Sequence, residues 1–88
     1  MKIKQGFVKR KIKDKFLVVA IGQARKDYRN FIELNQTASL IWDYIEKGKT
    51  SEQIAEEFVK EFNIDFDKAL ADVNEIISVL QKEGVICE

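Results

Sequence analysis

The chain has 88 residues, 45% of them hydrophobic and 34% charged, and this length and composition indicate one globular domain over residues 1–88 and argue against disorder. It has 15 basic and 15 acidic residues, but ten of the basic residues and only two of the acidic ones lie in residues 1–29. This division indicates either a polarised domain whose basic part attracts an acidic partner, or Lys and Arg on the solvated faces of strands.

The first part of the chain predicts three β-strands. Residues 6–12 alternate apolar and charged positions, a polar turn follows at residues 13–15, and residues 16–21 form a continuous, β-branched run. Together these segments predict a hairpin. A polar connection over residues 22–28 leads to a third strand over residues 29–34, so the three strands are expected to form an antiparallel meander.

After residue 34 the spacing of apolar residues changes to that of helices. Asn35 or Thr37 is placed to cap a largely apolar helix that ends at Gly48. Thr50 and Gln53 have the spacing of a capping box, in which a hydroxyl and an amide each accept a backbone N–H, and this pair predicts the start of a second helix.

A third helix is predicted from Asp65 or Asp67 to Lys82, with a stop at Gly84. The predicted fold is therefore α+β and winged-helix-like, with a three-stranded antiparallel N-terminal sheet followed by three helices.

The side chains that usually carry out catalysis are rare in this sequence. It contains no histidine, and its one cysteine, Cys87, permits neither an internal disulfide nor a Cys-x-x-Cys site. It also has no glycine-rich phosphate loop and no metal-ligand motif. We therefore expect a protein that is not an enzyme and needs no cofactor or metal. Because the sequence lacks a signal peptide and a run of ~20 apolar residues, we also expect a cytoplasmic protein.

A sheet with three helices also describes winged-helix proteins that bind nucleic acid, and this is the alternative function. In such proteins a helix enters the major groove and contacts phosphates through Lys or Arg. The predicted helix over residues 65–82 carries only Lys68 and Lys82 against several acids. This balance disfavours nucleic acid as a partner, although the basic strands leave the alternative open.

Three motifs follow one another along the chain. F-I-x-L-N-x-T-A-x-x-I-W begins at Phe31, G-K-T-x-x-Q-I-A-x-x-F begins at Gly48, and D-V-x-x-I-I-x-x-L-x-x-x-G-V-I begins at Asp72. With the opening segment FVKRKIKDKFLVVAIGQA, their order and spacing resemble the PqqD-like family, named for the pyrroloquinoline quinone biosynthesis protein D. The resemblance covers nearly the whole chain. One segment, GQARKDYRN, departs from the short Thr-Gly turn that many members have.

The resemblance implies a RiPP recognition element, a domain that captures the leader segment of a ribosomally synthesised precursor peptide and presents it to a modifying enzyme. The implied partner enzyme is a radical S-adenosylmethionine maturase or, in other pathways, a leader peptidase or cyclase. The leader would add a strand to residues 29–34 and lie against the helix over residues 65–82. The implied peptide-binding residues are Tyr28, Arg29, Asn30, Phe31, Ile32, Glu33, Leu34, Leu70, Val73, Asn74 and Ile77.

Each of these residues also has a purely structural interpretation. Phe31, Ile32 and Leu34 cannot all face the same way in a strand, so at least one of them is expected in the core. The apolar residues of the helix over residues 65–82 are more often core residues than ligand contacts. The sequence leaves open which of them face a peptide, and it also leaves open a homodimer formed through the same strand edge.

Overall fold

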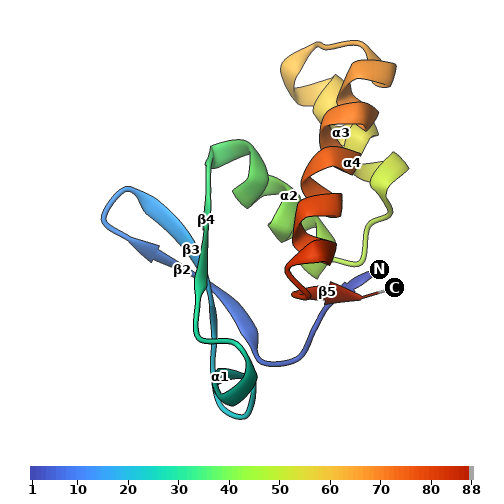
Figure 1. Cartoon of the computed structure of the whole chain (residues 1–88). Helices are drawn as coiled ribbons and strands as arrows, with labels where there is room; N and C mark the ends of the chain where they lie inside the picture. Colours follow the sequence, from blue (N-terminus) through green and yellow to red (C-terminus); the bar gives the residue numbers. More distant parts are fainter. Residues whose placement is uncertain (88) are drawn as a thin grey trace.

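The computed structural model describes residues 1–87 and has two parts, a projecting β-sheet and a group of helices (Figure 1). Three antiparallel strands form the sheet, in the order β2-β3-β4: β2 (Phe7–Ile12), β3 (Lys15–Ala20) and β4 (Phe31–Leu34). Three longer helices follow the sheet: α2 (Gln36–Glu46), α3 (Ser51–Phe62) and α4 (Phe66–Lys82). The predicted α+β, winged-helix-like fold is confirmed, and we call the sheet β2-β3-β4 the wing.

The helix starts are set by local hydrogen bonds, as the sequence predicts. The side chain of Asn35 accepts a hydrogen bond from the backbone N–H of Ala38 at 2.8 Å, so Asn35 rather than Thr37 caps α2. Thr50 and Gln53 form the complete capping box at the start of α3. These contacts satisfy backbone donors that the first turn of a helix leaves free.

The core is built mainly from α2, α3 and α4, and the wing adds Phe7, Val18, Ala20 and Leu34 to it. The largest fully buried side chain is that of Trp42 on α2, which belongs to this core. None of the helices formed by residues 1–87 is long and apolar enough to cross a membrane.

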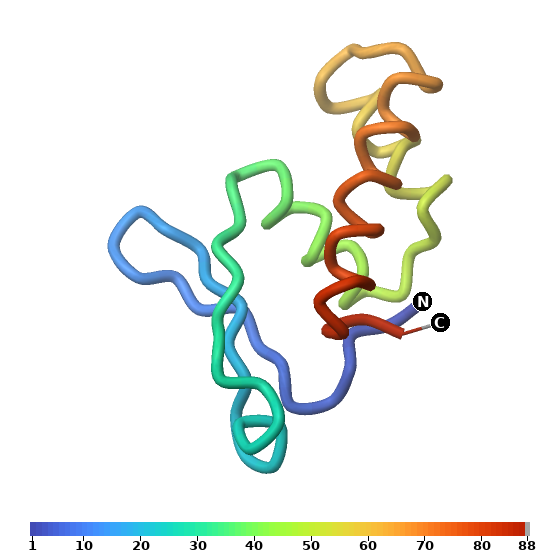
Figure 2. The backbone as a smooth tube through the Cα atoms, viewed as in Figure 1, coloured from blue at the N-terminus to red at the C-terminus, as the bar shows by residue number. Residues whose placement is uncertain are grey.

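Two short strands join the ends of the described chain. β1 (Lys2–Ile3) pairs antiparallel with β5 (Ile86–Cys87), and the backbone N–H of Lys4 donates to the carbonyl oxygen of Val85 at 2.9 Å. Figure 2 shows the two ends of the chain side by side, beneath the C-terminal end of α4. The sequence alone does not predict this pairing, because two-residue strands are too short to show a period.

The connection between β3 and β4 contains a short helix that the sequence does not predict. This helix, α1 (Ala24–Asp27), lies against the chain segment before β2. A Cβ atom added to Gly6, which has a φ of +97°, would lie 2.7 Å from Cβ of Ala24. Glycine at this position therefore permits both the backbone turn and the close approach of α1.

Candidate functional site

The edge strand β4 presents two different faces. Ile32 is half-buried against the core and Leu34 is buried, whereas Phe31 and Glu33 are exposed. This alternation is that of a strand with one face on the helices and one in solvent. In the part of the chain that the structure describes, β4 pairs with β3 only, so its other edge is open. An open edge offers unpaired backbone N–H and C=O groups to an extended segment.

A side-chain hydrogen bond holds one face of α4 near the start of β4. The hydroxyl of Tyr28, just before β4, donates a hydrogen bond at 2.9 Å to the carboxylate of Glu83, which caps the C-terminal end of α4. Helical spacing places Asp72, Ile76 and Val79 on the same face as Glu83. Asp72 and Ile76 are half-buried, and Val79 is 51% exposed. We call these four residues the α4 face.

The four helix residues predicted to bind a peptide lie on a different side of α4 from Glu83 by helical spacing, and their role in peptide binding stays a prediction. Val73 is fully buried and Ile77 is 7% exposed, so both belong to the core. Asn74 and Ile77 line a hollow with Met1 and residues at the start of α3, on another side of the helix. Leu70 is half-buried against the core. The sequence predicts the helix correctly, but its apolar period does not show which side lies beside β4.

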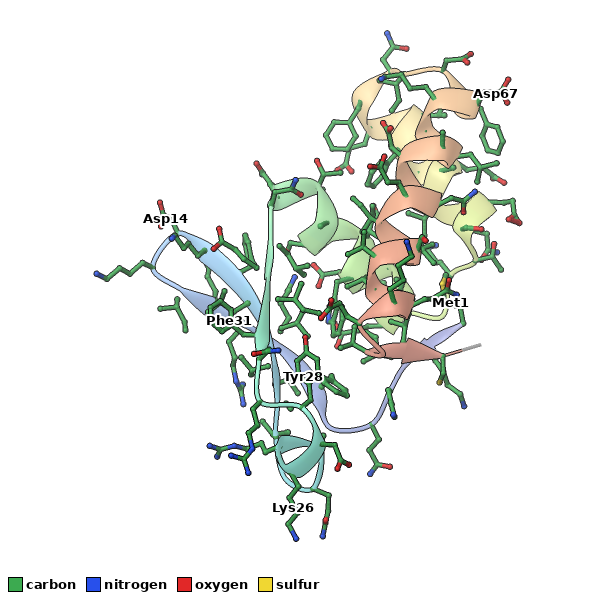
Figure 3. All side chains as sticks on the ribbon, in the orientation of Figure 1. Met1, Asp14, Lys26, Tyr28, Phe31 and Asp67 are labelled. Atoms are coloured by element: carbon green, nitrogen blue, oxygen red, sulfur yellow. The ribbon has the colours of Figure 1, made fainter. Side chains whose placement is uncertain are left out.

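Of the predicted strand residues, Tyr28 makes the most specific contacts. Its ring packs edge-on against Phe7, with ring centroids 5.3 Å apart. Burial, followed by the hydrogen bond to Glu83 and the negative charge of that carboxylate, raises the pKa of Tyr28 to about 12. Arg29 and Asn30 are exposed in the segment that leads into β4. Figure 3 shows Tyr28 on the side of β4 that faces α4 and Phe31 on the opposite side.

An ion pair that the sequence motifs do not reveal connects β2 of the wing to α2. Nζ of Lys9 donates hydrogen bonds of 2.6 Å to Oγ of Ser39 and 2.6 Å to Oδ1 of Asp43, both on α2. The Lys9 side chain is only 16% exposed, and its ammonium group lies 5.0 Å from the ring centroid of Phe16. The alternation of β2 is the sequence signal that could have identified Lys9, because Lys9 lies on the same strand face as the buried Phe7.

These features define a small winged-helix-like domain with an open strand edge beside one face of its last helix. The chain belongs to the family of coenzyme PQQ synthesis protein D (PqqD), whose family model matches residues 13–86. The resemblance seen in the sequence motifs is thereby confirmed.

Two solved structures have the same fold. A structure of TbiB1 in complex with the TbiA(beta) leader peptide is 24% identical in sequence, has a TM-score of 0.80, and aligns over 97% of this chain and 93% of that chain. A structure of lasso peptide synthetase B1 complexed with the leader peptide is 16% identical, has a TM-score of 0.82, and aligns over 99% of this chain and 96% of that chain. No curated protein matches the sequence of this chain.

Proposed function

We propose that this chain binds the leader segment of a ribosomally synthesised precursor peptide and presents it to a modifying enzyme. The observation that carries the proposal is the open edge of β4 in the same region as the α4 face. Two proteins of the same fold hold leader peptides in their structures, which supports this class of ligand.

The binding mode is the addition of a strand to β4. Backbone groups of the leader would pair with the open edge, and alternate leader side chains would point toward the helices. There they would meet the aliphatic side chains of Ile32, Ile76 and Val79, which are half-buried or exposed. Asp72 and Glu83 add negative charge to the α4 face. A suitable leader therefore carries an apolar anchor and a hydrogen-bond donor or cation beside it.

The proposed role is binding without catalysis, in the cytoplasm and without a cofactor. The partner enzyme is a radical S-adenosylmethionine maturase in the first instance, with a leader peptidase or cyclase as the alternatives. A homodimer that pairs two β4 edges would occupy the same backbone groups. Leader binding and such a dimer would therefore compete.

The charge of α4 argues against binding of duplex nucleic acid by this helix. It offers Lys68 and Lys82, whereas the acids on and beside it are Asp65, Asp67, Asp72, Glu75 and Glu83. A helix in the major groove needs the opposite balance to contact phosphates.

The test is an NMR titration of the isotope-labelled full chain with synthetic leaders from precursor genes that neighbour its own gene. We expect saturable amide shifts in residues 31–34 and at Asp72, Ile76 and Val79. In a series of leaders that each carry one N-methyl group, methylation at every second residue should weaken binding, because only alternate N–H groups of an added strand face β4. If no leader shifts these residues, the proposal is wrong.

A matched pair of variants checks the position of the site on α4. Val79→Asp places a charge on the α4 face, and Ser78→Asp places the same charge one residue away on another exposed side of the helix. We expect Val79→Asp to weaken leader binding about 10-fold or more and Ser78→Asp to leave it within about 2-fold. Equal affinities for the two variants would contradict this placement.

A further inference from the structure

The outer face of the wing, which points away from the helices, carries a row of apolar side chains across all three strands. The strand registers pair Val8 with Val19 and Val19 with Phe31, and they place Leu17 in the next row between Arg10 and Glu33. We call Val8, Leu17, Val19 and Phe31 the outer wing face.

These four side chains do not belong to the core. Phe31 is 62% exposed, and Val8, Leu17 and Val19 are half-buried. Within residues 1–87, the half-buried apolar side chains that pack against the core include Phe16 and Ile32 of the same strands, but not these three. Their partial burial therefore comes from one another and from neighbours on the sheet. A contiguous apolar face that is not part of the core is typical of an interaction surface.

Basic side chains surround one end of the outer wing face. Val19, Ile21 and Phe31 share a shallow hollow of about 770 Å³ with three cations. These cations are Arg25, Lys26 and Arg29.

The other end of the face is also basic. Arg10 is exposed there, and the one acid in the two central rows, Glu33, has its carboxylate 4.0 Å from Nζ of Lys15. The surface thus combines an aromatic and aliphatic centre with a cationic rim.

We propose that the outer wing face docks a partner protein through an acidic surface that carries an apolar anchor residue. The apolar anchor would fill the hollow beside Phe31, and acidic side chains would pair with the cationic rim. Phosphate recognition uses cations but makes no use of an aliphatic row, which favours a protein over a nucleic acid. The identification of this partner as the modifying enzyme rests on the proposed function. The chemistry of the surface does not depend on that function.

The α1 segment strengthens this assignment for this particular chain. Arg25 and Lys26 belong to α1, and Arg29 follows it, in the segment where the sequence departs from the short turn of many PqqD-like proteins. The α1 segment thus places these cations beside Phe31, at the rim of the outer wing face. The α4 face, in contrast, contains the acids Asp72 and Glu83, so the two proposed surfaces select for different charges.

The experiment uses the isotope-labelled full chain and a synthetic peptide rich in Asp and Glu with one leucine anchor. We expect saturable shifts at Val8, Val19, Phe31 and Arg29, and an affinity that falls about 10-fold or more when the salt concentration is raised from 50 mM to 500 mM. A peptide with every acid replaced by lysine should not bind. An equal response to the lysine peptide would overturn the proposal.

Two pairs of variants separate the surface from general effects on the fold. Phe31→Ser alters the outer wing face and Arg25→Glu alters its cationic rim, whereas Phe62→Ser and Lys60→Glu make the corresponding changes at exposed positions of α3. We expect the first pair to weaken binding of the acidic peptide about 10-fold and the second pair to leave it unchanged. Equal effects of both pairs would show that the outer wing face is not the binding surface.

Two further outcomes would overturn the proposal. One is duplex DNA that shifts the same residues more strongly than the acidic peptide does. The other is sedimentation that shows a dimer whose contacts map to the outer wing face, since a second copy would then be the occupant. Leader binding is measured at residues 32–34 and on the α4 face, and binding of the acidic peptide at Val8, Val19 and Arg29. The two titrations share only Phe31, so the failure of one proposal is distinguishable from the failure of the other.

Discussion

Gly6 is the residue at which a single added carbon atom would change the packing of the wing. Gly6→Ala would place a side chain at a positive φ, which is unfavourable, and would bring its Cβ atom to 2.7 Å from Cβ of Ala24. Gly22→Ala would place a side chain at a φ of +61° without a close contact, because nothing lies within 4 Å of the added atom. We expect losses in the free energy of unfolding of about 2–3 kcal/mol and about 1 kcal/mol, respectively, measured by urea denaturation.

The contact itself can be tested by a compensating substitution. Ala24→Gly in the Gly6→Ala background removes the Cβ atom that the new methyl group would meet. We expect the double variant to recover about 1 kcal/mol of the loss, less than the full amount because glycine weakens α1. No recovery would mean that backbone strain at Gly6 accounts for the whole effect.

The hydrogen bond between Tyr28 and Glu83 predicts a pH dependence in the alkaline range. The pKa of Tyr28 is about 12 in the folded protein against 10.0 ordinarily. Below pH 10 the hydroxyl is protonated in both the folded and the unfolded state, so its stabilising contribution is complete. As the pH rises from about 10 to 12 the unfolded state loses this proton first, and the contribution is lost.

Absorbance of the tyrosinate ion measures this pKa directly. The background should be Tyr44→Phe, because burial, with Glu61 as the next cause, also raises the pKa of Tyr44. We expect Glu83→Gln to lower the pKa of Tyr28, since it removes a carboxylate that accepts the hydrogen bond and repels the phenolate. An unchanged pKa would contradict the contact.

At the scale of elements, Lys9 connects the wing to α2. Lys9→Met would leave the hydroxyl of Ser39 and the carboxylate of Asp43 without their shared partner. We expect a loss of about 1–3 kcal/mol in the free energy of unfolding, and less for the control Lys11→Met, whose side chain is exposed. In a double-mutant cycle with Asp43→Asn, a coupling energy near zero would show that the ion pair does not stabilise the fold.

Two substitutions on α4 distinguish its buried side from the α4 face. Val73→Asp would place a carboxylate at a fully buried site, with a cost of about 3 kcal/mol or more, which is a large part of the stability of a small domain. We expect this variant to be unfolded by circular dichroism. Val79→Asp, at a position that is 51% exposed, should keep the spectrum of the unmodified protein.

The elements that the sequence predicts are those whose signals are local. The hairpin, the cap at Asn35 and the capping box at Thr50 each follow from residues within a few positions of one another, and all are present in the structure. The α4 face could not be predicted in the same way. The apolar period of α4 defines its buried stripe, but the hydrogen bond between Tyr28 and Glu83, 55 residues apart, shows which end and side of α4 lie near the segment that enters β4.

At the scale of the whole molecule, charge is divided between the wing and the helices. The basic residues of positions 1–29 lie on β1, β2, β3 and α1 and in the segments beside them, and most acids lie on α2, α3 and α4. The sequence predicts this polarity, since it depends on composition alone. It does not predict that Lys9 points inward while Arg10 points outward, because that depends on which face of the sheet meets α2.

The alternation of β4 predicts that its two faces act independently. Ile32 and Leu34 face the helices, and Phe31 and Glu33 face outward. A saturating leader should therefore change the affinity of the outer wing face for the acidic peptide by less than about 2-fold, measured by calorimetry. A larger change in either direction would show that the added strand contributes to the outer wing face or obstructs it.

The pairing of β1 with β5 has a consequence for joining this domain to other proteins. Both ends of the described chain leave the domain at one corner, and the tip of the hairpin around Lys13 and Asp14 lies at the opposite side of the molecule (Figure 1). A protein fused at either terminus would start from the same place and leave β4 unobstructed on both faces. A circular permutant that joins the old ends through a short linker and opens the chain in the hairpin turn should fold with the same topology.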